Sequence, residues 1–135
     1  MYTTLFNKFL TSGDTLWVLA SNELLFTSNK DGLSPLLEYI DTLAHNQQPV
    51  AIFDKVMGNA AALLSIKANG EEVYSPLASQ IAVDTLKEYG IRYHFKEIVP
   101  YISKPGQEEM CPMEKLSLHK GPVEFYHSVK NYLNG

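Results

Sequence analysis

Residues 110–115 read Met-Cys-Pro-Met-Glu-Lys and contain the single cysteine of the 135-residue sequence. Cys111 directly precedes Pro112, and proline favours the first position of a helix because it has no N–H group to satisfy. A thiol at a helix start faces unpaired backbone N–H groups, which favour its thiolate form. This pattern predicts a nucleophilic Cys111, with Pro112 and Glu114 in the ligand site around it. The alternative is a cysteine that packs as a small apolar residue.

A nucleophilic cysteine needs a base or a cationic partner nearby. His94, in the strand expected before the Cys111 loop, is the first candidate for this partner, and His119 is the second. Tyr101, in the same loop, would either stack on a planar ligand or pack the loop against the protein. Zinc would need three or four Cys, His, Asp or Glu ligands, and the sequence has neither a C-x-x-C nor an H-x-x-x-H spacing. We therefore expect no metal site and no cofactor.

A second group of polar residues follows a continuously apolar segment at residues 50–53, as expected of a central strand. Asp54 stands at the end of this strand, where ligands collect in open α/β sheets, and is a candidate catalytic group. Gly58 and Asn59 would lie in or beside the first turn of the next helix, whose N-terminus favours an anion. Lys55 would add a cation, so the pattern favours a small anionic or nucleotide-like ligand. The alternative is that Asp54 only caps the helix and Lys55 is solvated.

The elements that must position these residues alternate along the chain. Apolar spacing, caps and turn residues predict the order α-ββ-α-β-α-β-α-β-α-α. Two residues at 21–22 would join the first two strands in a hairpin, and Ser34 and Ser79 would each cap a helix. The expected helices start near residues 3, 35, 55, 80, 112 and 122. Stop signals stand at 12–14, 46–49, 69–70 and 90, and the last helix is expected to reach about residue 133. The expected strands cover 15–20, 23–28, 50–53, 72–75 and 91–99, with a proline-marked loop after the fourth.

This order predicts an α/β fold of three layers, α/β/α, with a mixed sheet and an antiparallel hairpin at its edge. No repeat or linker divides the chain, so we expect a single domain over residues 1–135. In the helix that starts near residue 80, Ile81, Ala82, Leu86 and Tyr89 are expected to point inward. In the last helix, Val123, Tyr126, Val129 and Leu133 are aligned on one face.

Composition excludes several classes of function. The net charge is −4 and the sequence has no Lys/Arg run, which argues against nucleic-acid binding. No apolar segment approaches the roughly 20 residues that span a bilayer, and we see no signal peptide. A single cysteine cannot form an internal disulfide, which fits a reducing cytoplasm. We expect a cytoplasmic protein with no membrane partner.

With these residues described, the chain resembles a family of small bacterial proteins of unknown function whose structural relatives have the cytidine-deaminase-like fold. The resemblance covers residues 14–118, and 119–135 look like an added C-terminal helix. It rests on four strings: Asp-Lys-Val-x-Gly-x-Ala-Ala-Ala at 54–62, Tyr-Gly-Ile-x-Tyr-His at 89–94, Val-Pro-Tyr-Ile at 99–102, and the string at 110–115. The resemblance implies the same three-layer fold.

Working deaminases of that fold carry an H-x-E motif and a P-C-x-x-C motif, and this chain lacks both. The corresponding positions read Gly-Leu-Ser-Pro-Leu-Leu at 32–37 and Asp-Lys-Val-Met-Gly at 54–58. Zinc-activated water is central to deaminase chemistry, so we predict no zinc-dependent nucleoside deamination. The leading interpretation is a zinc-free domain that binds a small, anionic or nucleotide-like ligand. Its pocket would be shared by Asp54, Lys55 and Gly58 at the carboxyl end of the sheet and by the Cys111 loop folded over the same edge. A cysteine-dependent enzyme or redox protein using Cys111, and a non-catalytic interaction module that forms a homodimer, stay open as alternatives.

Overall fold

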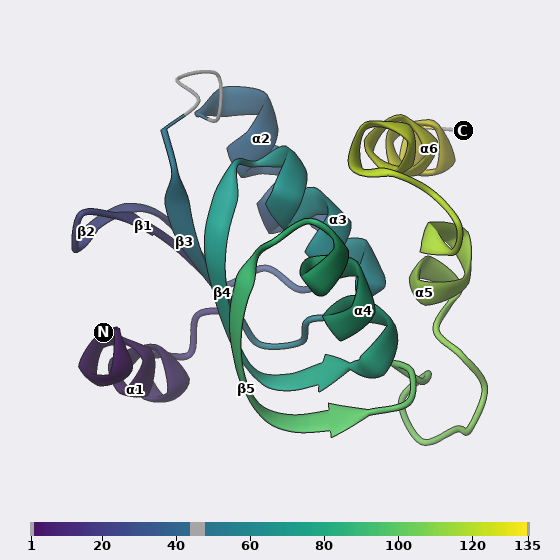
Figure 1. The fold of residues 1–135 in the computed structure, drawn as a ribbon, viewed down its shortest axis with the longest axis horizontal. Coiled ribbons are helices and arrows are strands. Elements are labelled where there is room, and N and C mark those ends of the chain that lie inside the picture. Colours follow the sequence, from purple (N-terminus) through teal and green to yellow (C-terminus); the bar gives the residue numbers. More distant parts are fainter. Residues whose placement is uncertain (1, 44–47, 135) are drawn as a thin grey trace.

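The computed structural model describes residues 2–43 and 48–134. Its elements follow the predicted order (Figure 1). The strands are β1 (Leu16–Ala20), β2 (Glu23–Ser28), β3 (Val50–Asp54), β4 (Gly70–Ser79) and β5 (Arg92–Val99). The helices are α1 (Thr3–Ser12), α2 (Ser34–Thr42), α3 (Asn59–Lys67), α4 (Gln80–Glu88), α5 (Pro112–Ser117) and α6 (Pro122–Asn134).

Within the described residues the strands form one mixed five-stranded sheet in the order β2-β1-β3-β4-β5. β3, β4 and β5 are parallel, whereas β1 runs antiparallel to both β2 and β3. Ser21 and Asn22 join β1 to β2, and both have a positive φ, as a two-residue hairpin turn requires. The predicted α/β class, mixed sheet and hairpin edge are therefore confirmed.

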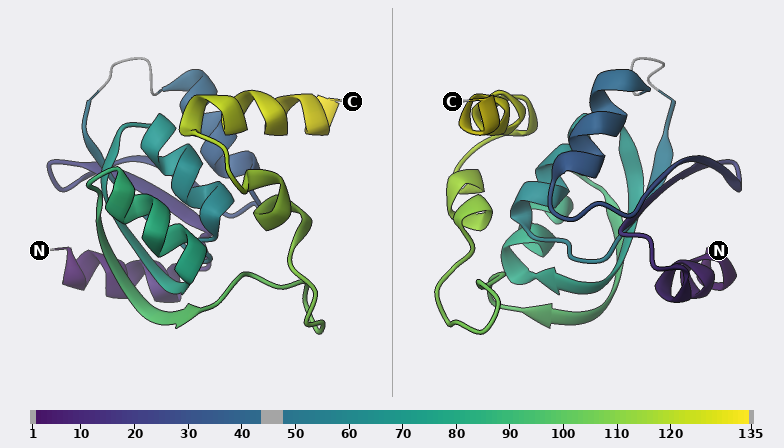
Figure 2. Two further views of the ribbon diagram at one scale, coloured as in Figure 1. Left: turned by 45° about the vertical axis from the view of Figure 1, so that its right-hand side comes forward. Right: turned by 180° about the vertical axis from the view of Figure 1, so that it is seen from behind.

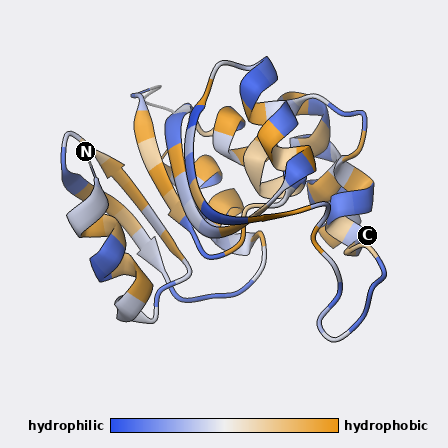
Figure 3. Ribbon diagram, turned by 60° about the horizontal axis from the view of Figure 1, so that its bottom comes forward, coloured by the Kyte–Doolittle hydropathy of each residue, from blue (hydrophilic) through white to orange (hydrophobic). Residues whose placement is uncertain are grey.

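Helices cover both faces of this sheet. α1 lies on one face, α2, α3 and α4 lie on the other, and α5 and α6 pack outside α3 (Figure 2). Side chains alternate along β3: Ile52 joins the core under α2–α4, and Phe53 joins an aromatic cluster under α1. Hydrophobic residues concentrate in the strands and on the helix faces turned toward them (Figure 3).

The segment between β3 and α3 differs from the prediction. α3 begins at Asn59, four residues later than expected, because Met57 pairs with the end of β4 instead of entering the helix. The Met57 N–H donates to Leu77 O at 2.8 Å, and Met57 O accepts from Ser79 N–H at 3.1 Å. Gly58 then occupies the N-cap position, so the alternative of Asp54 as a cap is wrong.

β4 also continues through Pro76, where a loop was expected. The last residue pair between β3 and β4 joins Phe53 to Tyr74, so Pro76 lies beyond that ladder, where a missing N–H costs little. At the start of α2, Leu33 holds the N-cap position instead of Ser34. The expected stop at residues 46–49 lies partly outside the described residues.

One residue predicted to point inward, Tyr89, is instead 43% exposed at the end of α4. In α6 the buried residues are Phe125 and Val129, whereas Val123 and Leu133 are exposed. The Ser79 cap of α4 is confirmed, because its side chain accepts the Ala82 N–H. Across residues 2–43 and 48–134, every helix falls short of the length or the apolar character that a bilayer span demands.

Candidate functional site

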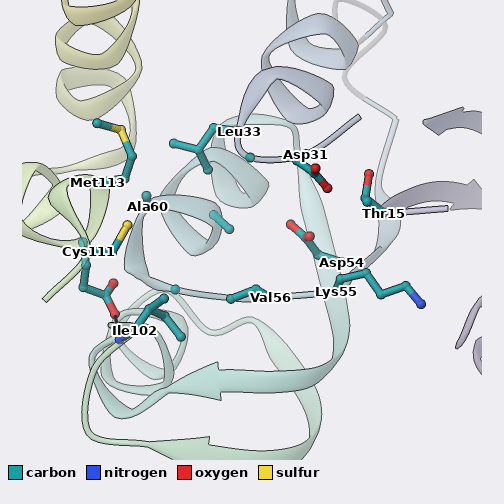
Figure 4. Close-up of a pocket in the computed structure, with 14 residues that line it drawn as sticks. Thr15, Asp31, Leu33, Asp54, Lys55, Val56, Ala60, Ile102, Cys111 and Met113 are labelled. Atoms are coloured by element: carbon teal, nitrogen blue, oxygen red, sulfur yellow. Dashed lines mark hydrogen bonds between the residues drawn. The ribbon is translucent and has the colours of Figure 1, made fainter. Parts of the chain in front are cut away.

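A pocket of about 240 Å³ lies at the carboxyl end of β3 (Figure 4). Its walls come from the start of β1, the segment before α2, the β3–α3 connection and the segment from residue 100 to α5, which we name the strap. Apolar and acidic side chains dominate the lining, which consists of Thr15, Asp31, Gly32, Leu33, Asp54, Lys55, Val56, Gly58, Ala60, Ala61, Ile102, Cys111, Met113 and Glu114.

Asp54 is the most perturbed ionisable group in this pocket. Side-chain alternation along β3 places it on the α2–α4 face of the sheet. Burial raises the pKa of its carboxyl to about 7, although hydrogen bonds from the backbone of Val56 and Lys55 act in the opposite direction. Figure 4 shows the carboxyl groups of Asp54 and Asp31 turned toward each other across one side of the pocket. A carboxyl that titrates near neutral pH can both accept and donate a proton there.

Lys55 does not supply a cation to the pocket. Its Nζ donates to Leu10 O at 3.2 Å and lies 5.0 Å from the centre of the Phe9 ring, so it contacts α1. Figure 4 shows the side chain extending away from the Asp54 carboxyl. The cause is again alternation, because consecutive residues at the end of a strand point to opposite faces. Lys55 therefore lines the pocket, but its ammonium group lies at α1, outside the pocket.

Glu114 holds the strap against the start of α3. Its side chain is 2% exposed; Oε1 accepts the Asn59 N–H at 2.5 Å, and Oε2 accepts the Ile102 N–H at 2.7 Å. Gly58 permits this approach, since a Cβ at that position would lie 3.1 Å from Glu114 Oε1 and 3.0 Å from an Ile102 carbon. The N-terminus of α3, expected to receive an anionic ligand, is thus already in contact with the protein's own carboxylate.

Cys111 occupies the predicted N-cap position of α5, and Pro112 follows at the first helical position. Its sulfur lies at the end of the pocket away from Asp54 (Figure 4). The side chain makes no capping hydrogen bond, so the expected acceptance of α5 backbone N–H groups by the sulfur is wrong. The backbone is held instead, since Cys111 N–H donates to Ile102 O at 2.8 Å. Whether Cys111 reacts stays a prediction.

His94 lies away from this pocket. Its ring stacks on Tyr74 at a centroid distance of 4.3 Å, and Nε2 lies 2.8 Å from Glu72 Oε2. Tyr74 belongs to the aromatic cluster under α1, so His94 is on the opposite face of the sheet from Cys111. The structure therefore does not join the predicted cysteine–histidine pair.

Four other candidates also lie outside the pocket lining. Asn59 donates through Nδ2 to Ser117 Oγ at 3.0 Å and accepts from Thr85, which ties α3 to α4 and α5. Asn59 and His119 border a separate open cavity of about 790 Å³ beside α4. Tyr101 donates its hydroxyl to Glu108 O at 2.5 Å, so it packs the strap on itself, and Pro112 is exposed.

Sequence reasoning missed the contribution of the hairpin to the site. β1 is antiparallel to β3, and Leu16 pairs with Asp54, so the start of β1 lies beside the carboxyl end of β3. Thr15 N–H donates to Ser28 O at 2.8 Å, and this pairing brings the chain from β2 to Asp31 along the same edge. The hairpin was predicted, and its antiparallel sense was the signal that could have placed Thr15 and Asp31.

The pocket is rich in hydrogen-bond acceptors, but its acidic side chains do not form a metal-binding cluster. Among the described residues, no group of three or more His, Cys, Asp or Glu side chains lies close enough to hold a metal ion. Asp31, Asp54 and Glu114 give it carboxyl groups, whereas Leu33, Ile102 and other apolar side chains form the remaining wall. This arrangement suits recognition of a compact molecule and proton exchange with it.

Comparison with known proteins identifies one family. The family described as TM1506, domain of unknown function (DUF1893), matches residues 5–133. A crystal structure of a DUF1893 family protein from Thermotoga maritima is similar with a TM-score of 0.84 and 25% sequence identity. The similarity covers 96% of this chain and 88% of that one. No curated protein matches the chain.

Proposed function

Because the chain belongs to the DUF1893 family, whose description assigns no function, we propose a function from the pocket itself: this protein binds a small molecule between β3 and the strap. The proposal is carried by one observation. Two sequence stretches more than fifty residues apart, at Asp54–Gly58 and at Cys111–Glu114, line one cavity. Ligand sites are typically concave, mostly apolar and furnished with a few convergent polar groups, as this pocket is.

The position of the pocket in the fold supports the proposal. In open α/β sheets, ligands bind outside the carboxyl ends of the strands. Asp54 ends β3, and the strap leads from the end of β5 to α5, with Ile102 and Cys111 lining the same pocket as Asp54 (Figure 2). We also propose that the fold is cytidine-deaminase-like and that the protein works without zinc. The hairpin edge and the alternating helices and strands support this fold. A reducing cytoplasm is consistent with the single cysteine thiol.

The alternatives receive less support. A cysteine-dependent enzyme would use Cys111, yet neither His94 nor His119 lies in the pocket with it. A non-catalytic module that forms a homodimer would use the end of α6, where Tyr132 and Leu133 are 59% and 56% exposed. Both stay predictions.

The test compares two tryptophan substitutions at exposed valines. Val56 is 41% exposed at the rim of the pocket, and Val123 is 56% exposed on α6, away from it. A fragment library is screened by ligand-observed NMR against the wild type, V56W and V123W. We expect fragment binding to be lost in V56W and retained in V123W, with bound fragments slowing alkylation of Cys111 by iodoacetamide. Binding that survives equally in both variants would refute the proposal.

A further inference from the structure

We infer that the ligand of this pocket is a compact organic cation, such as an amidine or an amine on a small apolar body, and not an anion. This inference rests on the proposed function and names its ligand class. It starts from the charges that border the cavity. Among the described residues that line it, the ionisable side chains are Asp31, Asp54, Lys55, Cys111 and Glu114.

The cationic end of Lys55 is not available to a ligand. Its ammonium group donates a hydrogen bond to Leu10 O and lies over the Phe9 ring, on the α1 face of the sheet. An anion entering the pocket would therefore meet carboxyl groups without a neutralising side chain, which is unfavourable at low dielectric. The anion preference of the α3 N-terminus offers no compensation, since Glu114 already accepts the Asn59 N–H.

Two carboxyl groups remain to receive a cation. Both oxygens of Glu114 already accept backbone N–H groups, so this residue shapes the wall. Asp31 is exposed at the mouth of the pocket. Asp54 also accepts backbone N–H groups, from Val56 and Lys55, but unlike Glu114 it is only half-buried, and its carboxyl is turned toward Asp31 (Figure 4). A planar amidinium presents two N–H donors to a carboxylate, which is the strongest form of such a hydrogen-bonded pair.

The apolar part of the pocket wall indicates the size and the apolar character of the uncharged part of the ligand. Leu33, Val56, Ile102 and Met113 are the larger apolar side chains of the lining. An apolar cavity of about 150 Å³ holds one benzene molecule. The volume of about 240 Å³ here accommodates a single ring with one small polar substituent. Benzamidine matches this size and charge and serves as the probe.

Three molecules with the same ring test the inference: benzamidine, benzamide and benzoate carry charges of +1, 0 and −1 on nearly the same shape. Their affinities are measured by protein-observed NMR titration at about pH 8, where most of the Asp54 carboxyl is ionised. We expect benzamidine to bind about tenfold or more tightly than benzamide, and benzoate not to shift pocket resonances. The D54N variant should weaken benzamidine binding about tenfold, and D31N should weaken it less.

The outcomes separate this inference from the proposal beneath it. If benzoate or benzamide binds in the pocket as tightly as benzamidine, the ligand class is wrong and the pocket is still a binding site. If benzamidine shifts only residues outside the pocket, or D54N binds it as tightly as the wild type, the inference fails. The fragment screen with V56W and V123W decides independently whether the pocket binds any small molecule.

Discussion

The side chain of Glu114 is joined to the backbone of Asn59, 55 residues earlier, by a buried hydrogen bond of 2.5 Å. Its other oxygen accepts the Ile102 N–H at 2.7 Å, so one carboxylate links the start of α3 to both ends of the strap. The positive end of the α3 dipole stabilises that buried negative charge. The acid of the Cys-Pro-Met-Glu-Lys string thus builds the pocket wall by fixing backbone, and we expect its removal to loosen the strap.

Substituting Glu114 with glutamine tests this role. A glutamine side chain offers one carbonyl oxygen, so one of the two backbone N–H groups, at Asn59 or Ile102, loses its acceptor. We expect the free energy of unfolding to fall by about 1–3 kcal/mol in urea denaturation. Glu109 pairs with Lys104 and Lys115 on the surface of the same segment, and E109Q should leave stability nearly unchanged. Equal losses of stability in E114Q and E109Q would contradict the role of Glu114 in holding the strap against α3.

Gly58 makes room for the same contact. Its φ of −81° suits any residue, but an alanine Cβ would lie 3.0 Å from Ile102 Cγ1 and 3.1 Å from Glu114 Oε1. We expect G58A to lose about 1–3 kcal/mol of stability, because either the strap or Glu114 must move. Gly121 is a matched control: its carbonyl accepts the Phe125 N–H at the start of α6, and a Cβ there would meet only Tyr89 Oη at 3.7 Å. A G58A variant as stable as G121A would show that the space is not limiting.

Much of the fold could be predicted from local signals. The hairpin at Ser21–Asn22, the Ser79 cap and the Cys111–Pro112 helix start each depend on the chemistry of adjacent residues, which a sequence displays directly. The late start of α3 depends instead on Met57 pairing with Ala78, a contact between segments that are distant in the chain. Such pairing overrides the helix propensity of residues 55–58 and cannot be deduced from them.

The candidate site divides in the same way. Asp54 and Cys111 were both placed near the carboxyl end of the sheet, and the structure brings them to one pocket. His94 cannot be the partner of Cys111, because its side chain points to the α1 face of the sheet, where it stacks on Tyr74. Which face a residue of β5 points to depends on how β5 pairs with β4, and the sequence of β5 alone does not show this pairing. The divergence of Asp54 and Lys55, in contrast, follows from strand alternation and was within reach of the sequence.

Lys55 provides a third test, because the structure assigns it to α1. Replacing its ammonium group with the methyl group of methionine removes the hydrogen bond to Leu10 O and the cation–π contact with Phe9. We expect K55M to lower the free energy of unfolding by about 0.5–1.5 kcal/mol, while benzamidine affinity stays within about twofold of the wild type. Lys8 is exposed on α1, so K8M controls for the loss of one positive charge near that helix. A large change in benzamidine affinity in K55M but not in K8M would show that the Lys55 ammonium group contacts the ligand.

Asp54 gives the stability of the protein a defined pH dependence. Burial raises the pKa of its carboxyl to about 7, above the value of about 4 in an unfolded chain, so the folded state binds the proton more tightly. The stabilisation from this group is therefore complete below about pH 4 and is lost as the pH rises through 7.

Asp31, Cys111, Glu114 and the backbone of Lys55 border the same pocket, so the comparison must isolate one carboxyl. Asparagine cannot ionise, and its carbonyl can still accept the backbone N–H groups of Lys55 and Val56. We expect the stability of D54N relative to the wild type to rise between about pH 4 and pH 8, by at most about 4 kcal/mol, in urea denaturation at each pH. A stability difference that is constant across this range would show that the pKa of the Asp54 carboxyl is not raised in the folded protein.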